Sequence, residues 1–449
     1  MRNSLVMIAG LILAACGSSD GNRGNAGGGL DSCSNNDQKQ FVWDAMRDWY
    51  LWNNLLPGNI LLSDYASPEA LLDHLMSYSP DDSNGAPLDR FSFIGSAAAD
   101  AAFFGEGQYE GFGFSSKQFA ADDIRLTQVF ADSPADLGGL ARGQRILEIN
   151  GRTVAAIQAA EGIDAVLGTS PLTFVMQQPD GAQLTTTIAR DIVTITPVPQ
   201  YRLIDAGDGS GRLVGYIELA SFIGTADDAL NAVFAKFVAN GINDVILDLR
   251  YNGGGLVSTA NLLGDLLGGD VAENLLFSAT HFNADRAAAN DSSNFFDRLA
   301  ASMSLSRLVV VASDRTASAS ELVTNSMMPH VEVVIVGDTT FGKPVGQVGF
   351  EFCSKILRPT AFQTVNADGY GDYFDGIPVD CPATDELSIA VGADADPNVI
   401  AAMAYLDTGA CPVVVAPTVS KAQATQQTGL PESRSQRPAP PWREFAGAY

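Results

Sequence analysis

The chain has 449 residues, more than one hydrophobic core usually organises, so two or three domains are expected. Its 52 acidic side chains outnumber 26 basic ones, and the formal net charge of −26 argues against nucleic acid or an anionic membrane surface as a direct partner. Hydrophobic residues make up 46% of the chain and charged residues 17%, which is enough apolar material for folded cores.

Residues 1–16 have the pattern of a targeting segment. Arg2 precedes an apolar run over 5–15 that is too short to span a membrane in the mature protein. The run ends in LAAC, which resembles a bacterial lipobox and implies cleavage before Cys16 and acyl chains on its new amino terminus. An ordinary signal peptide with an incidental cysteine is the alternative. Residues 17–32 are then a flexible tether, and the protein is expected on the periplasmic or cell-surface side of a bacterial envelope, lipid-anchored to a membrane.

A small helical domain is expected over 33–104. Apolar residues recur at helical spacing in its first part, at Val42, Ala45, Trp49 and Trp52. Pro57-Gly58 is expected to end this helix, and Ser67-Pro68 is expected to begin a second one. An aromatic stripe of this kind is typical of a packed core rather than of a ligand site.

Residues 105–195 combine a glycine-rich loop with short strand patterns. The loop consists of Gly111, Phe112, Gly113 and Phe114, and it precedes a β-run over 124–130 and a strand over 143–149 that ends in an Asn-Gly turn. This pattern resembles a PDZ domain, which adds an extended peptide to a sheet edge. The resemblance implies that the four loop residues hold a peptide's terminal carboxylate with backbone N–H groups. A glycine-rich hairpin without a binding role is the alternative.

The segment 196–411 has the pattern of an α/β domain. It opens with a strand over 213–219, a helix over 226–238 and a buried strand over 243–250. That strand leads into Gly253, Gly254 and Gly255, a tight turn at the carboxyl end of a parallel strand, where N–H groups can point at a reacting oxygen. A plain connection is the commoner cause of such a turn. Asp248 and Arg250 are expected to stabilise the strand end rather than to take part in chemistry.

Two further strands, over 308–312 and 331–336, flank a helix predicted over 317–328. A serine at the start of this helix would lie beside free N–H groups and the positive end of the helix dipole, a setting that suits acyl transfer. Lys343 follows the second strand and lies between Phe341-Gly342 and Pro344. A lysine acts as a base only when neutral, so its reference pKa of about 10.4 must fall on burial. A solvated loop lysine is the alternative.

These segments resemble the C-terminal processing peptidases, also called tail-specific proteases. The match includes TASASE at 316–321, FGK at 341–343, and a glutamine four residues later. The resemblance selects Ser318 over Ser320 as the nucleophile, with Lys343 as its base 25 residues later. It also implies that Gln347 orients Lys343.

The same resemblance implies an oxyanion hole formed by the N–H groups of Gly254 and Ala319, with Gly253 as the alternative to Gly254. It implies a mixed α/β spiral core like that of crotonase-like enzymes. The fold class expected is therefore an α/β multidomain protein with a small helical N-terminal domain, a PDZ-like β-rich domain and this peptidase core.

The remaining cysteines and histidines bear on cross-links and on the mechanism. Without Cys16 four cysteines remain, and three pairings are possible; we favour Cys353–Cys381 with Cys33–Cys411, the alternative being free buried cysteines. No metal-ligand spacing is present and no cofactor is expected. None of the three histidines lies in a Ser-His-Asp motif, although His330 is close in sequence to the site and His74 and His281 are not.

The sequence thus predicts a membrane-tethered serine endopeptidase that acts on polypeptides recruited by their accessible C-terminal ends, without nucleic acid or metal. Two alternatives remain: a non-catalytic PDZ lipoprotein scaffold, and a Ser/Lys hydrolase of a non-peptide ester or amide. Residues 412–449 are rich in Pro, Gln, Ser and Thr and are predicted to be disordered.

Overall fold

The computed structural model of the chain describes residues 32–207 and 209–412. The expected signal peptide with Cys16, nearly all of the tether and nearly all of the predicted tail lie outside the described residues. Within the described ranges, no helix combines the length and the apolar character needed to cross a bilayer.

The largest sheet has six strands in the order β10-β11-β12-β15-β16-β21, and all neighbours run parallel except the antiparallel pair β10-β11. Its central strands are continuous runs of buried Val, Ile and Leu, which is typical of parallel strands covered on both faces. The bounds are β10 (Gln200–Asp205), β11 (Leu213–Glu218), β12 (Asp244–Asp248), β15 (Arg307–Ala312), β16 (Glu332–Gly337) and β21 (Cys381–Pro382).

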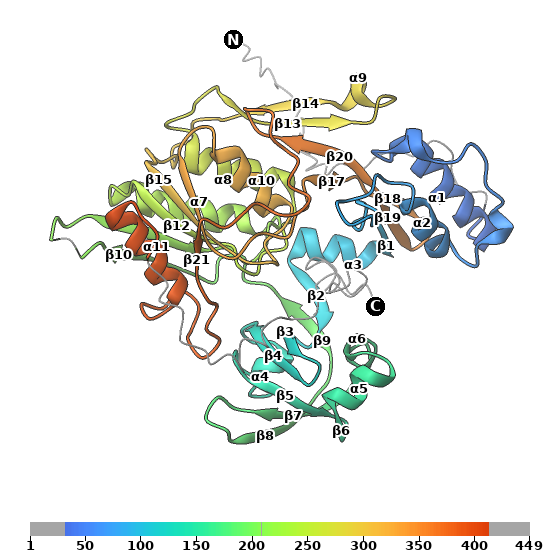
Figure 1. Ribbon diagram of the computed structural model, residues 1–449, viewed down its shortest axis with the longest axis horizontal. Coiled ribbons are helices and arrows are strands. Elements are labelled where there is room, and N and C mark those ends of the chain that lie inside the picture. Colours follow the sequence, from blue (N-terminus) through green and yellow to red (C-terminus); the bar gives the residue numbers. More distant parts are fainter. Residues whose placement is uncertain (1–31, 208, 413–449) are drawn as a thin grey trace, which may run out of the picture.

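Helices cover both faces of this sheet (Figure 1). One face packs against α7 (Ala226–Ala239), α8 (Val257–Gly268) and α10 (Ala319–Met327). The other face packs against α11 (Pro397–Thr408). The β-α-β order predicted from the sequence is confirmed. The helix α10, between β15 and β16, begins directly after Ser318.

Two smaller antiparallel sheets extend the core. One has the order β14-β13-β20-β17, and the other has the order β1-β19-β18. Their bounds are β14 (Ser292–Phe295), β13 (Leu276–Phe282), β20 (Thr360–Val365), β17 (Val345–Gln347), β1 (Phe93–Ser96), β19 (Lys355–Arg358) and β18 (Phe350–Phe352), with the short helix α9 (Ala287–Asn290) between β13 and β14.

The N-terminal helices α1 (Asn35–Trp49) and α2 (Pro68–Met76) pack against the β18-β19 hairpin and appear on the right of Figure 1. Their shared core includes Trp43, Trp49 and Phe350, so the aromatic stripe is core as expected. The prediction that the first helix runs to Pro57 was wrong. It ends at Trp49 because Tyr50 turns to an extended ψ of 133° and Leu51 N–H donates to Thr360 O on β20. Short helical turns follow, η1 (Asn53–Leu55) and η2 (Leu62–Asp64).

The PDZ-like module lies below the large sheet in Figure 1. It is a sheet in the order β3-β4-β5-β7-β8, with β6 paired to β5, and a separate pair β2-β9. The Asn-Gly turn predicted after β5 is confirmed, since Asn150 and Gly151 both have positive φ. Its strands are β2 (Gln108–Gly111), β3 (Phe114–Ala120), β4 (Asp123–Val129), β5 (Arg145–Ile149), β6 (Arg152–Thr153), β7 (Leu172–Gln177), β8 (Gln183–Ile188) and β9 (Asp191–Thr194); its helices are α4 (Pro134–Leu137), α5 (Val154–Ala160) and α6 (Ile163–Leu167), and α3 (Ala97–Ala101) and η3 (Ala102–Glu106) precede it.

The favoured disulfide pairing was wrong. The structure joins Cys33 to Cys353, with 5.9 Å between their Cα atoms, and Cys381 to Cys411, with 5.2 Å. Cys353 lies in the turn between β18 and β19, and this hairpin packs on α1, where the rings of Phe41 and Phe352 stack. Cys33, two residues before α1, therefore lies close enough to Cys353 to form the disulfide.

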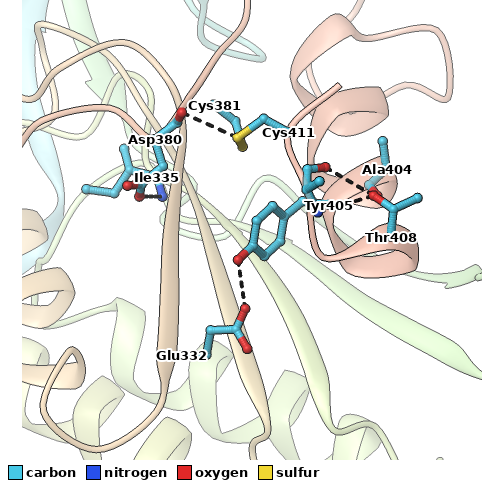
Figure 2. Close-up of a disulfide and its surroundings, with 9 residues drawn as sticks. Glu332, Ile335, Asp380, Cys381, Ala404, Tyr405, Thr408 and Cys411 are labelled. Atoms are coloured by element: carbon cyan, nitrogen blue, oxygen red, sulfur yellow. Dashed lines mark hydrogen bonds between the residues drawn. A yellow bond between two sulfur atoms is a disulfide. The ribbon is translucent and has the colours of Figure 1, made fainter. Parts of the chain in front are cut away.

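Cys381 lies elsewhere, on the edge strand β21 of the large sheet, beside the end of α11 (Figure 2). The hydroxyl of Tyr405 on α11 donates to Glu332 on β16 at 2.8 Å, so this helix is held close to the sheet edge. Sequence separation alone could not give this neighbourhood.

Candidate active site

Ser318 lies at the junction between β15 and α10. Its φ of 56° and ψ of −116° are unusual for a residue other than glycine, and such strained conformations persist only where the surroundings fix them. The preceding turn is fixed by the hydroxyl of Thr316, which donates to Leu249 O at 2.7 Å, and by Ser313 Oγ, which donates to Arg250 O. Ser318 itself is half-buried, while its helix neighbours are buried.

Glu321, in the first turn of α10, accepts hydrogen bonds from both halves of the site. Its Oε2 accepts from the backbone N–H of Ser318 at 2.9 Å and of Lys343 at 2.8 Å. Its Oε1 accepts from Gly342 N–H at 2.8 Å and Thr340 Oγ1 at 2.5 Å. Because one carboxylate oxygen binds both N–H groups, the backbones of Ser318 and Lys343 are adjacent.

The Glu321 side chain is fully buried. Burial raises the pKa of its carboxyl above the ordinary value, and the four hydrogen bonds oppose that increase. Sequence reasoning assigned no role to Glu321, although the residue is part of the TASASE motif. A glutamate three residues after a helix-capping serine is itself a recognised signal, because it can accept the N–H of that serine.

Lys343 is buried, with 5% of its surface exposed. Its Nζ donates to Gln347 Oε1 at 2.8 Å, so the structure brings these two predicted residues together. The amide of Gln347 is fixed in turn, because its Nε2 donates to Phe91 O at 2.7 Å and to Arg358 O at 3.0 Å.

The N-terminal region contributes to this site, which sequence reasoning missed. The ring of Phe91 faces Lys343, with Nζ 5.7 Å from the ring centroid. Arg90 donates to Gly342 O and to Phe374 O, each at 2.9 Å, and so binds the loop that carries Lys343. The side chain of Asp89 accepts the N–H groups of Phe91 and Ser92 and fixes this turn. These contacts span about 250 positions of sequence, and only the fold reveals them.

The glycine turn after β12 lies against Ser318. Gly254 has a φ of 99°, and a Cβ atom there would be 2.7 Å from Ser318 Cβ and 2.8 Å from Ala319 N, so only glycine fits. Its own N–H donates to Asn252 Oδ1 at 2.9 Å, and is thus engaged in this structure. Within the described residues, the N–H of Gly253 has no acceptor.

Asp248 and Arg250 stabilise the strand end, as expected. The Arg250 guanidinium binds Asp248 at 2.6 Å and Asp396, at the start of α11, at 2.7 Å. These carboxylates raise the pKa of Arg250 against the opposing effect of burial. Nearby, burial and the charge of Asp248 raise the pKa of Glu218 to about 7.

The histidines lie outside this cluster. His330 precedes β16, whereas Lys343 follows it, so the two are at opposite ends of the strand. Its Nε2 is 2.9 Å from Leu276 O and its ring packs on Phe296. His74 contacts Tyr78, and His281 contacts Asp291.

The predicted peptide loop lines a pocket of about 80 Å³ in the PDZ-like module. Gly113 has a φ of 89°, and a Cβ atom there would be 2.1 Å from Ser133 Cβ, so the loop requires glycine at this position. The pocket is lined by Gly111, Phe112, Gly113 and Phe114 together with residues of α6 and Arg190.

Comparisons with known proteins agree with this architecture. The model of peptidase family S41 matches residues 213–382, and the model of the S41 N-terminal domain matches residues 37–93. The chain belongs to peptidase family S41. In this S41 chain a PDZ domain model also matches, over residues 102–177.

Curated relatives of this S41 chain are carboxyl-terminal processing proteases. Carboxyl-terminal-processing peptidase 1, chloroplastic, of Arabidopsis thaliana is 28% identical over 232 residues, covering 51% of this chain and 45% of its own length. Carboxy-terminal processing protease CtpA of Bacillus subtilis is 23% identical over 272 residues, covering 60% and 55%. The chain thus spans about half the length of the curated relatives it matches.

Solved structures share the fold. An S41-assigned protein from Bacteroides fragilis has a TM-score of 0.64 at 23% identity, covering 82% of this chain and 97% of its own. The photosystem II D1 C-terminal processing protease has a TM-score of 0.53 at 19% identity, covering 82% and 100%. The S41 chain therefore has a helical N-terminal domain, a PDZ domain and an S41 peptidase core.

Proposed function

We propose that this chain is a serine endopeptidase of the carboxyl-terminal processing type, with Ser318 as nucleophile and Lys343 as base. The observation that carries this proposal is the Glu321 carboxylate, whose Oε2 accepts the N–H groups of both residues. Lys343 Nζ donates at 2.8 Å to the neutral amide of Gln347, and the lysine side chain is buried. Both features favour a lysine that can accept a proton.

In the proposed reaction, the Nζ of neutral Lys343 takes the hydroxyl proton of Ser318 while Oγ bonds to the scissile carbonyl carbon. The oxyanion is stabilised by the N–H of Ala319 and by that of Gly254, once Asn252 releases it, or of Gly253. Lys343 then gives its proton to the leaving amine as the C–N bond breaks. Lys343 then deprotonates a water molecule whose oxygen attacks the acyl carbon, and as the ester C–O bond breaks Lys343 gives that proton to Ser318 Oγ.

The PDZ domain is proposed to recruit substrates. A polypeptide would add as a strand to β3, an edge strand of its sheet, with its terminal carboxylate at the N–H groups of the loop 111–114. The domain division is proposed as 33–104, 105–195 and 196–411.

The alternatives are a PDZ scaffold without catalysis and a Ser/Lys hydrolase of a non-peptide ester or amide. The intact Ser318-Lys343-Gln347 set counts against the first, and the PDZ domain counts against the second.

We also propose that the mature chain begins at an acylated Cys16, which anchors it to a membrane of the bacterial envelope, and that the segment 17–32 links this anchor to the folded domains. The LAAC sequence supports this proposal. Metabolic labelling with a fatty acid should mark the wild-type chain and leave Cys16→Ala unlabelled. Equal labelling of the two chains would contradict it.

The experiment that tests catalysis is cleavage of an unfolded model protein by the soluble chain from residue 33 onward. Ser318→Ala and Lys343→Ala should each lose at least about 1000-fold in rate, with folding intact by circular dichroism. Lys236→Ala, on the exposed surface of α7, is the matched control and should keep full rate. Loss in Ser320→Ala but not in Ser318→Ala would contradict the assignment, and an inert wild-type chain would favour the scaffold.

A further inference from the structure

The pocket of the PDZ domain carries opposite charges at different places along its length. It lies between the loop 111–114, the edge strand β3 and the helix α6, which contributes Asp164 and Leu167. Arg190, just before β9, completes the lining. The arrangement of these side chains follows from the hydrogen bonds that fix α6.

The hydrogen bonds of two side chains, Arg190 and Gln158, show that α6 runs antiparallel to β3. At its C-terminal end, the guanidinium of Arg190 donates to Gly168 O at 3.2 Å and to Glu110 O at 3.0 Å, so this end lies beside the carboxylate loop. At its N-terminal end, Gln158 accepts the N–H of Ile163 and donates to the side chain of Gln118 on β3, each at about 3 Å. That end therefore lies beside the far part of β3.

Arg190 places a positive charge at the loop. Its side chain is 17% exposed and is held by the two main-chain carbonyls. The carboxylate of Glu110 is 3.9 Å away but is itself 67% exposed, so it is well solvated. A free peptide carboxylate at the loop would thus meet N–H groups and a fixed guanidinium.

Asp164 lies one helical turn before the C-terminal end of α6, further along the groove. Neighbouring protein atoms withdraw water from its carboxylate and raise its pKa, and no cation within the described part of the chain offsets that effect. A cationic group on a ligand would supply the missing counter-charge.

An added strand presents alternate side chains to α6. Side chains of a strand alternate between faces, so the last and third-last residues of a bound peptide face the helix and the second-last faces away. In such a complex, the last residue would lie near Leu167 and Phe114, and the third-last residue would lie near Asp164.

We propose that Asp164 makes this PDZ domain select polypeptides with a basic side chain two residues before an apolar C-terminal residue. This inference rests on the proposed recruitment of C-terminal ends. The net charge of −26 acts in the same direction, because it disfavours acidic chain ends.

The test uses the full chain with Ser318→Ala, so that bound peptides are not cut, and fluorescence anisotropy with three labelled peptides. The first ends in Lys-Ala-Leu with a free carboxylate, the second in Glu-Ala-Leu, and the third is the C-terminal amide of the first. The Lys peptide should bind about 5-fold or more tighter than the Glu peptide. Adding Asp164→Lys should reverse the preference, whereas Asp180→Lys, the same charge change in the β7–β8 turn outside the pocket, should not.

The outcomes separate this inference from the recruitment step. Equal binding of the Lys and Glu peptides, both tighter than the amide, would overturn the role of Asp164 and keep recruitment by C-terminal ends. A Lys preference that persists in Asp164→Lys would also overturn it. If the amide binds as tightly as the free carboxylate, or no peptide binds, recruitment fails and the inference fails with it.

Discussion

Two short helices of this chain each carry a carboxylate in their first turn, and the two are used in opposite ways. Glu321 on α10 is fully buried and accepts four hydrogen bonds from the segments that carry Ser318 and Lys343. Asp164 on α6 lines an open pocket, and no cation of the described residues offsets the effect of burial on its carboxylate. The first carboxylate is saturated by the protein, and the second is available to a ligand.

The two carboxylates differ because catalysis and recognition place different demands on a side chain. Reacting groups must be fixed before substrate arrives, because a small displacement costs much of the rate, and main-chain hydrogen bonds to a buried carboxylate provide that rigidity. A recognition groove instead gains affinity from charges that the ligand completes. The core therefore encloses its carboxylate in protein, while the PDZ domain exposes one to the groove.

Glu321→Gln should disturb the catalytic geometry more than any other change considered for these two carboxylates. The new amide can accept from only one oxygen, and its NH2 group would face N–H donors, so the backbones of Ser318 and Lys343 should separate. We expect kcat to fall about 100-fold with KM little changed. Glu321→Asp, which keeps the charge, should recover part of the rate.

The control for this prediction is peptide binding at the PDZ groove. Affinity for a free C-terminal peptide should be unchanged in Glu321→Gln, since the lining of the groove comes from the PDZ domain and α10 belongs to the peptidase core. If both kcat and groove affinity fell together, the variant would have lost its fold rather than its catalytic geometry, and the contrast between the regions would fail.

Much of the core architecture could be predicted from the sequence. The central strands and the helix beginning after Ser318 follow from continuous apolar runs and a short amphipathic segment. The predicted pairing of Gln347 with Lys343 came from family resemblance, and the two side chains are in contact.

The rest depends on contacts between segments that are distant in sequence. Phe91 contacts Gln347 across 256 positions, and Cys33 meets Cys353 across 320, because the β18-β19 hairpin packs on the N-terminal helices. No local pattern encodes such neighbours. Likewise, the glycine turn predicts exposed N–H groups, but only the structure shows that Asn252 accepts the N–H of Gly254.

A third carboxylate, that of Glu218, makes the stability of the core depend on pH. Glu218 is buried beside Asp248, and its pKa is raised from 4.5 to about 7. The unfolded chain releases this proton near pH 4.5, whereas the folded chain keeps it until about pH 7, so the stability that it contributes is present below pH 4.5 and is lost as pH rises to 7.

Glu218→Gln removes this loss. The unfolding free energy of the variant minus that of the wild type should increase by about 1 to 3 kcal/mol from pH 5 to pH 9. Urea unfolding at both pH values measures this difference. Exposed Asp180→Asn, in the PDZ domain, should show no such difference. A constant offset between wild type and Glu218→Gln at all pH values would contradict the prediction.

A smaller effect is expected from a change at Gln347, which accepts a hydrogen bond from Lys343 Nζ. Gln347→Glu places a negative charge where Nζ now meets a neutral oxygen at 2.8 Å, so it should favour the charged lysine. We expect about tenfold lower kcat/KM at neutral pH, with the rising limb of the pH profile moved to higher pH.

A purely structural role would lower the rate at every pH without moving that limb. Gln347→Met, which fills the space without a charge or an amide acceptor, is the matched control and should not move the limb to higher pH. A Gln347→Glu profile with the wild-type midpoint would show that this side chain does not act on the base.

The smallest effect is expected at an exposed contact between the two regions, which also meet where buried Arg315 donates to Ser116 O on β3. Lys117 on β3 pairs with Asp314 of the turn before Ser318 at 2.9 Å, and the two side chains are 39% and 55% exposed. Such exposed pairs contribute little and are screened by salt, so Lys117→Ala should change unfolding free energy by less than about 0.5 kcal/mol. Cleavage at high salt should be the same in both chains. A larger loss, persisting in salt, would mean that this exposed pair joins the groove strand to the catalytic turn as firmly as the buried contact of Arg315 with Ser116 does.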